Sequence, residues 1–282
     1  MLGKLIKYEW KGLRKPLSIL YLVLLGITIL TGILIVTINP KYDDVAVGFS
    51  VLFTMLSVFL YYFGVIACAL GTMLIIAIRF YKTCYTDEAY LTHTLPVSTK
   101  QLVAAKTITA VLCHLLSLVL VIVTAVLLVG VFITHMMNLG EIQASDLSSI
   151  AWSELNAEFK DEMGIGFFGY FGFLGIYSLI GAVCGIISVL GCVSLGQLYT
   201  KHRVLGAIIA YFAFNTIQQI ISYIAMIPMY GQIFEAEYTG ETITMFSLMG
   251  PSFLILLVIT IITAVIMYFI NLYMMTKRLN LE

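Results

Sequence analysis

The side chains that could carry chemistry in this chain gather in two places, and the first is the segment RFYKTCYTDEAYLTHTLPVSTKQ at residues 79–101. It combines the carboxylates of Asp87 and Glu88 with a high density of aromatic rings. Aromatic side chains are enriched where proteins bind one another, and a solvated linker has no need of them. We therefore expect this segment either to bind a partner protein or to pack on the chain's own helices.

The second place is the run NTIQQIIS, which contains Asn215, Gln218, Gln219 and Ser222. On a helix, Asn215, Gln219 and Ser222 share one face and Gln218 lies beside it. Amides in an apolar helix need hydrogen-bonding partners, so these side chains are expected to line a path, to contact a second subunit or to bond to a neighbouring helix. A lone His114 is expected to be a satisfied interior residue rather than a proton relay.

Motifs for enzymatic chemistry are missing from the sequence. It has no HExxH zinc pattern, no GxSxG nucleophile elbow and no phosphate-binding GxxxxGK[ST] loop. The long apolar stretches contain no Asp or Glu, which a proton- or sodium-driven carrier would need. We expect no catalytic residue, no metal site, no cofactor and no ATP site in this chain.

The elements that position these residues are membrane-spanning helices. The chain of 282 residues is 61% hydrophobic and only 11% charged, whereas soluble domains are about 25% charged. Six apolar stretches are long enough to cross a bilayer, which needs about 20 helical residues. They cover residues 17–38, 48–78, 102–134, 167–195, 204–230 and 248–275. We predict an all-α integral membrane protein, forming a single transmembrane domain over residues 1–282.

The positive charges set the predicted orientation, because cytoplasmic flanks of spanning helices are rich in Lys and Arg. One set of flanks holds thirteen of them and the other only two, Lys41 and Lys160. The thirteen are Lys4, Lys7, Lys11, Arg14, Lys15, Arg79, Lys82, Lys100, Lys106, Lys201, Arg203, Lys277 and Arg278. Both termini are therefore expected in the cytoplasm, and the chain in the cell membrane.

The segments between the spans have their own patterns. Residues 1–16 carry apolar side chains at helical spacing opposite basic ones, which is typical of an interfacial helix. Pro16 would end that helix; a merely basic flank is the alternative, and a cleavable signal is not expected. Pro96 would end a short helix near Asp87, and Ser98 with Gln101 would form a capping box for the next span.

On the outer side, residues 135–166 form an acidic loop. It contains one predicted amphipathic helix, whose apolar face is Trp152, Leu155, Phe159 and Met163. Gly164 and Gly166 would end this helix. The segment 227–251 is broken by Pro228, Gly231, Gly240, Gly250 and Pro251, and residues 228–247 within it would form either a re-entrant element or a surface loop.

Small residues supply two further expectations. Gly181 and Gly185 make a GxxxG pattern, and Gly196 extends it, which favours tight helix packing. The five cysteines, Cys68, Cys84, Cys113, Cys184 and Cys192, lie in apolar runs or in the predicted cytoplasmic loop, so we expect no disulfide.

Three segments of the sequence resemble the permease subunits of bacterial type-2 ABC exporters. They are the opening MLGKLIKYEWKG, the loop RFYKTCYTDEAYLTHTLPVSTKQLVAAK and the run SLGQLYTKHRVLGAIIAYF. With six helices, the resemblance covers essentially the whole chain. It indicates the family but no particular substrate, and drug or peptide export are both compatible with it.

The resemblance implies roles for particular residues. The chain would pair with a second permease, identical or homologous, and with two cytoplasmic ATPase subunits that bind Mg-ATP. The coupling helix that docks on the ATPase would comprise Arg79, Phe80, Tyr81, Lys82, Tyr85, Asp87, Glu88 and Tyr90. Lys201 and Arg203 would form a second contact, and the second and fifth spans would line the path.

Two other classes of function stay open at this point. One is a non-transport membrane protein, such as a sensor or an immunity protein that binds an antimicrobial peptide. The other is a membrane-embedded enzyme, which would need a cluster of His, Asp or Glu within the spans. The lipid bilayer is an expected partner and nucleic acid is not.

Overall fold

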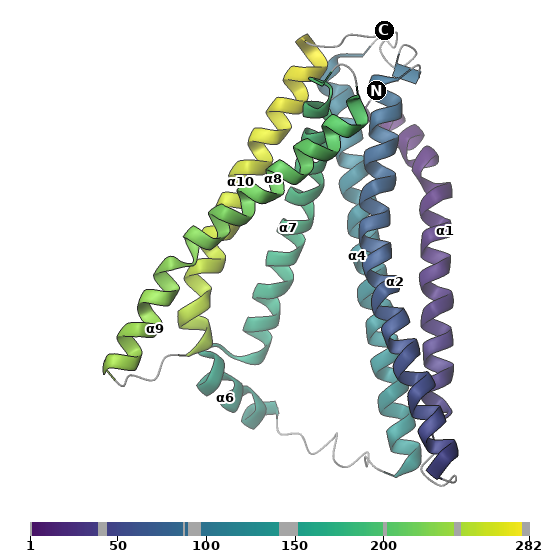
Figure 1. Ribbon diagram of the computed structural model, residues 1–282, viewed down its shortest axis with the longest axis vertical. Helices are drawn as coiled ribbons and strands as arrows, with labels where there is room; N and C mark the ends of the chain where they lie inside the picture. The colour runs from purple at the N-terminus through teal and green to yellow at the C-terminus, as the bar shows by residue number, and fades with distance from the viewer. Residues whose placement is uncertain are drawn as a thin grey trace. The chain divides into compact units, whose positions relative to one another are not determined.

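The computed structural model describes residues 2–38, 44–86, 88–89, 97–140, 152–199, 202–239 and 244–277. Within these ranges the regular structure is α-helical, with no strand (Figure 1). The helices are α1 Leu2–Val36, α2 Asp44–Tyr85, α4 Thr99–Leu139, α6 Trp152–Met163, α7 Phe167–Gly196, α8 Arg203–Ala225, α9 Ile227–Thr239 and α10 Met245–Lys277.

Six helical stretches are long and apolar enough to cross a membrane, as the sequence predicted. They are α1, α2, α4, α7, the stretch Arg203–Glu235 and α10. Many large apolar side chains on these helices are exposed, for example Leu22, Phe59 and Val126. A soluble protein does not expose so much apolar surface, so lipid is the solvent for these faces.

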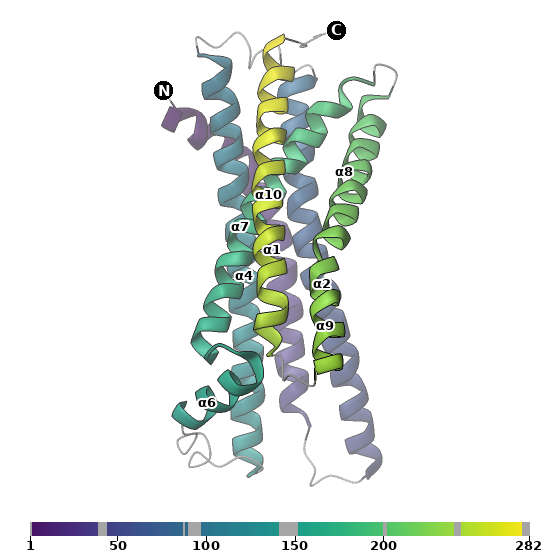
Figure 2. The same ribbon diagram turned by 90° about the vertical axis from the view of Figure 1, so that its left-hand side faces the viewer.

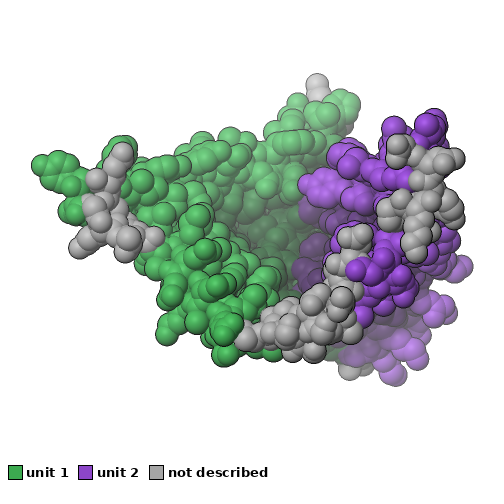
Figure 3. Space-filling model, turned by 90° about the horizontal axis from the view of Figure 1, so that it is seen from below, with its two compact units in different colours: residues 1–2, 79–111, 151–282 green, residues 3–78, 112–150 purple. Residues whose placement is uncertain are grey.

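The chain divides into two compact units, which Figure 3 shows in different colours. One comprises residues Gly3–Ile78 and Leu112–Ile150, and therefore contains α1 and most of α2 and α4. The other comprises Met1–Leu2, Arg79–Val111 and Ala151–Glu282. The end of α2 and the start of α4 thus belong to the same unit as α7, α8 and α10.

Hydroxyl groups bond between helices in the unit that contains α1. Thr31 donates to the carbonyl of Ser57 at 3.1 Å, and Thr72 donates to Ser117 at 3.1 Å. Gly71 brings α2 close to Leu20 of α1, since a Cβ there would lie 3.2 Å from that side chain. A hydroxyl on a helix can also donate to a backbone carbonyl of its own helix. Such hydroxyls are tolerated in apolar surroundings, because their hydrogen always has an acceptor.

The other unit is built around α7, which packs against both α8 and α10. Gly191 faces Met267 of α10, and Gly196 faces Ala207 of α8. At both glycines a Cβ would collide with the facing residue, so the helices approach closely here. By contrast, Gly181 and Gly185 meet no neighbour within 4 Å among the described residues, so the predicted GxxxG is not the site of this close packing.

Pro16 lies inside α1 and does not end it, contrary to the prediction. Proline removes one backbone donor and crowds the carbonyl four residues earlier, which here belongs to Gly12. Figure 2 shows the N-terminal part of α1 bent away from the axis of the rest. A bend at a proline keeps the helix continuous, so residues 2–16 are the N-terminal part of α1 rather than a separate element.

The predicted loop 79–101 is shorter in the structure. α2 continues past residue 78 to Tyr85, and α4 begins at Thr99. Ser98 caps α4 as predicted, because the backbone N–H of Gln101 donates to its Oγ at 3.4 Å. Five of the proposed docking residues, Arg79 to Lys82 and Tyr85, therefore lie on a helix that extends beyond the predicted span.

The amphipathic helix predicted in residues 135–166 is present as α6. Phe159 packs its ring 5.5 Å from that of Phe167 at the start of α7. The N–H of Phe167 donates to the side-chain oxygen of Asn156 at 2.9 Å, which caps α7 from α6. Gly164 has a φ of +86° and ends α6 in the left-handed conformation that glycine adopts without strain.

The span predicted at residues 204–230 is divided. α8 ends at Ala225, and α9 begins at Ile227 with Pro228 in its first turn, where a missing N–H costs nothing. α10 starts at Met245 and runs through Gly250 and Pro251. The predicted segment 228–247 is thus α9 plus the start of α10, with residues 240–243 outside the described part; whether it is re-entrant stays a prediction.

Candidate functional site

The α2 terminal segment, residues 79–85, buries one side against other helices of its unit. Phe80, Cys84 and Tyr85 are buried, and Cys84 is fully so. The ring of Tyr85 lies 6.1 Å from that of Phe80 and 6.5 Å from that of Tyr81. The helical spacing therefore directs an aromatic cluster inward and leaves Lys82 exposed.

Tyr85 ties this segment to two other helices. Its hydroxyl donates to Ser194 of α7 at 2.9 Å, and Ser194 donates to the side-chain oxygen of Asn271 of α10 at 2.8 Å. Ser194 and Asn271 are 0% and 1% exposed. A hydroxyl has one hydrogen, so the carbonyl of Leu190, at 3.1 Å from Ser194, is only an alternative acceptor.

This Tyr85–Ser194–Asn271 triad is an unusual arrangement for helix ends within an apolar bundle. Three polar side chains are buried together, and each of the two hydroxyls donates its hydrogen to the next side chain. Leaving a buried donor or acceptor unpaired costs about 1–3 kcal/mol. The triad therefore favours one relative position of α2, α7 and α10 at this end of their unit.

α4 holds the same segment from another direction. The ammonium group of Lys106, 4% exposed, donates to the hydroxyl of Thr83 at 2.6 Å. Thr83 in turn donates to the carbonyl of Arg79 at 2.9 Å. Because a buried charge is costly unless it is bonded, this contact fixes the start of α4 against the end of α2.

The charged outer side of the segment is weakly held. A guanidinium nitrogen of Arg79 lies 3.9 Å from a carboxylate oxygen of Glu88, and both side chains are partly exposed. Exposed pairs of this kind contribute about 0–1 kcal/mol. Glu88 thus lies at the surface beside a rigid segment, where another protein can reach it.

The remaining proposed docking residues are placed less fully. Asp87, Tyr90 and Lys201 lie outside the described residues. Arg203 is the first residue of α8, next to the crossing of α7 and α8 at Gly196 and Gly206. The structure therefore brings Arg79, Phe80, Tyr81, Lys82 and Tyr85 into one segment, and puts Arg203 at the start of another helix of the same unit.

The four polar residues of α8 separate into two kinds. Gln218 reaches a neighbouring helix, since its side-chain nitrogen lies 3.4 Å from the hydroxyl of Thr260 on α10. Ser222 donates to the carbonyl of Gln218 within its own helix. Asn215 and Gln219 are exposed, and among the described residues their side chains bond within α8, to the carbonyl of Tyr211 and the hydroxyl of Tyr223.

Exposed amides one turn apart identify a distinct face of α8. In hydrocarbon an amide keeps unmet hydrogen-bonding capacity, and that is costly. Asn215 and Gln219 are therefore expected to face water or protein in the membrane, not lipid. Of the predicted roles, interhelical bonding fits Gln218, whereas a path or a subunit contact fits Asn215 and Gln219.

Sequence reasoning missed Ser194, Asn271, Thr83 and the burial of Lys106. A signal was present for Asn271, because it is a lone amide within the apolar run of α10 and must find a partner. Nothing in the sequence pairs it with Ser194, 77 residues away. For His114, the buried Nδ1 has no hydrogen-bond partner in the described structure. The prediction of a satisfied interior histidine therefore does not hold for that nitrogen.

Two further observations bear on chemistry. The five cysteines are free and buried. Among the residues that the structure describes, no group of three or more His, Cys, Asp or Glu side chains is placed to hold a metal ion.

Relatives give no independent guide. No family model, curated protein or solved structure matches the chain.

Proposed function

We propose that this chain is the membrane subunit of an ATP-driven exporter, and that separate cytoplasmic ATPase subunits supply its energy. In this proposal both termini lie in the cytoplasm of the cell membrane, and residues 1–16 lie along its inner surface. The basic flanks support this orientation, because Lys and Arg accumulate on the cytoplasmic side of membrane proteins.

The observation that carries the proposal is the anchored α2 terminal segment. It presents Lys82 at the surface, and Glu88 lies exposed just after its end. Tyr85 and Thr83 fix its inner side to α4, α7 and α10. A surface that is rigidly joined to several spanning helices can transmit a force from outside the membrane to those helices. A flexible loop would deform under the same force and leave the helices in place.

The mechanism follows from these contacts. An ATPase that docks on residues 79–88 and closes on ATP would displace the end of α2. The buried triad would carry that displacement to α7 and α10, because breaking it would leave buried polar groups unpaired at a cost of about 1–3 kcal/mol. The spanning helices would then rock around the transport path.

The exposed face of α8 supports a second permease copy or a homologous permease. Asn215 and Gln219 are expected to meet either this partner or the water of the path between the two subunits. Amphiphilic drugs, peptides and lipids all suit an apolar path that carries a few amides.

Affinity purification from the native host tests the proposal. We expect an ATPase with a phosphate-binding loop to co-purify with the tagged chain. Changing Asp87 and Glu88 together to Ala should reduce the amount recovered, because it removes the acidic surface of the docking segment. A matched change of Glu154 and Glu158 to Ala, on the exposed face of α6, should leave the recovery unchanged.

Recovery of the chain without any ATPase would contradict transport by this mechanism. It would favour the alternative of a sensor or an immunity protein that acts alone.

A further inference from the structure

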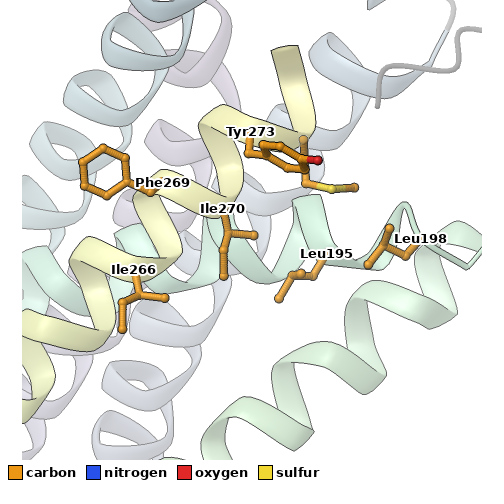
Figure 4. Close-up of a pocket in the computed structure, with 7 residues that line it drawn as sticks. Leu195, Leu198, Ile266, Phe269, Ile270 and Tyr273 are labelled. Atoms are coloured by element: carbon orange, nitrogen blue, oxygen red, sulfur yellow. The ribbon is translucent and has the colours of Figure 1, made fainter. Parts of the chain in front are cut away.

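A pocket of about 710 Å³ opens on the surface of α10, near its C-terminal end (Figure 4). Its lining is Leu195, Leu198, Ile266, Phe269, Ile270, Tyr273 and Met274. Figure 4 shows that the walls come from α10 on one side and from the end of α7 and the turn after it on the other. All of these residues belong to one compact unit.

The pocket is apolar and its mouth is exposed. Phe269 and Leu198 on the rim are 61% and 54% exposed. A cavity that offers water no polar partners does not hold ordered water. On a helix long and apolar enough to span the membrane, such a pocket suits an apolar chain better than water.

Its position along the helix places one end near the membrane surface. Ile266 and Tyr273 are seven residues apart, so the pocket extends over about 10 Å of α10. Lys277, the last residue of α10, lies only four positions after Tyr273. An apolar chain in this pocket would therefore begin close to the headgroup layer.

A positive charge is held at that end. The ammonium of Lys277 lies 5.7 Å from the centre of the Tyr273 ring, within cation–π range. The sequences of α7, α8 and α10 contain no Asp or Glu, so these three helices offer no carboxylate to neutralise the charge.

We propose that this pocket binds one anionic phospholipid, with an acyl chain between α7 and α10 and its phosphate group beside Lys277. The combination of an apolar slot and a cation at its interfacial end matches the two parts of such a lipid. A second copy of this chain fits less well, because the lining offers almost no hydrogen-bonding group besides the Tyr273 hydroxyl. The proposal does not depend on the transport function.

The test uses the purified full-length chain in detergent and native mass spectrometry. The probes are phosphatidylglycerol and phosphatidylcholine with the same dioleoyl chains. We expect one phosphatidylglycerol to bind about fivefold or more tighter than phosphatidylcholine, the factor expected for one Lys at an anionic headgroup. Lys277→Gln should abolish this preference, whereas Lys160→Gln on the exposed face of α6 should retain it.

A second pair of variants tests the pocket itself. Ile270→Trp should fill it and weaken binding of either lipid about tenfold, as expected when about two methylene groups lose their burial. Ile261→Trp is the matched control, since it lies nine residues earlier on α10, on the opposite face and outside the pocket. Should Ile270→Trp fail to fold, Leu198→Trp fills the same pocket from the other wall at an exposed position.

Three results would overturn the proposal. One is equal binding of the two lipids by the unmodified chain. Another is equal binding by the Trp variant in the pocket and by its control. The last is that the Trp variant in the pocket loses a dimer of the chain instead of losing bound lipid. That result would identify the pocket as a contact between copies.

Discussion

At the scale of single residues, the structure uses polar groups sparingly and pairs them across helices. Thr72 with Ser117, Gln218 with Thr260 and the triad at Tyr85 each join two or three helices. Hydrophobic burial does not distinguish a helix surface from lipid, so polar pairs and close packing must choose the position of one helix against another.

The triad gives the first residue-scale prediction. Ser194→Ala removes the acceptor of Tyr85 and the donor to Asn271, so we expect unfolding to become easier by about 1–3 kcal/mol. The free energy of unfolding can be measured by circular dichroism in mixed micelles with increasing SDS. Ser178→Ala is the control, because Ser178 is exposed and donates only to Gly175 of its own helix.

A second variant separates the hydrogen bond from packing. Tyr85→Phe keeps the ring contacts with Phe80 and Tyr81 but removes the hydroxyl. We expect an increase in the reactivity of Cys84, which is fully buried beside it, toward a small maleimide as the end of α2 loosens. Unchanged thiol reactivity in this variant would show that the aromatic contacts alone hold the segment.

Most of the triad could not be predicted from the sequence. Tyr85 and its neighbours stood out because aromatic residues are uncommon in a solvated loop. Ser194 did not stand out, since serine is common in membrane helices and its partner lies 77 residues away. Which polar residues meet depends on the rotation of each helix, and local patterns do not determine that rotation.

At the scale of elements, glycine position decides how closely two helices approach. A Cβ on Gly196 would collide with the backbone of Ala207, whereas a Cβ on Gly181 would meet nothing in the described structure. Gly196→Ala should therefore destabilise the fold by about 1–3 kcal/mol through overpacking. Gly181→Ala should be neutral or slightly stabilising in the same SDS titration, because alanine favours helix.

The outcome of that comparison has a second use. If Gly181→Ala proved as damaging as Gly196→Ala, the open face of α7 at Gly181 and Gly185 would have to be covered by protein in the membrane, either the chain's other compact unit or another chain.

The sequence predicted which segments form spanning helices, but it predicted the ends of those helices less well. The spans followed from apolar length, because each must cross about 30 Å of hydrocarbon. That argument gives no limit for the parts outside the membrane. α2 has 42 residues, or about 63 Å of helix, so its charged end past residue 78 was taken for a loop. Pro16 and Pro251 were taken as breaks, but both are accommodated within long helices.

At the scale of the whole molecule, the exposed amides of α8 call for a partner. Changing Asn215 and Gln219 together to Leu should reduce self-association or association with a homologous permease, because it removes two exposed amides that would bond to the partner. The measurement is the apparent mass in nanodiscs formed at low protein density. Changing Ile217 and Ile220, which are also exposed on α8, to Leu should have no such effect.

A partner that tolerates the double Leu variant would leave the water-lined path as the remaining explanation for the two amides. In that case the variant should lose transport while its association stays intact.

The orientation in the membrane is the claim on which the transport proposal as a whole depends, and two exposed lysines test it. Lys82 lies at the end of α2 and Lys160 on α6, and the five native cysteines are buried, so background labelling is low. In intact cells, Lys160→Cys should react with a membrane-impermeant maleimide, and Lys82→Cys should react only after permeabilisation, because basic flanks stay in the cytoplasm. The reverse labelling would put the α2 terminal segment outside the cell, where no ATPase could drive it.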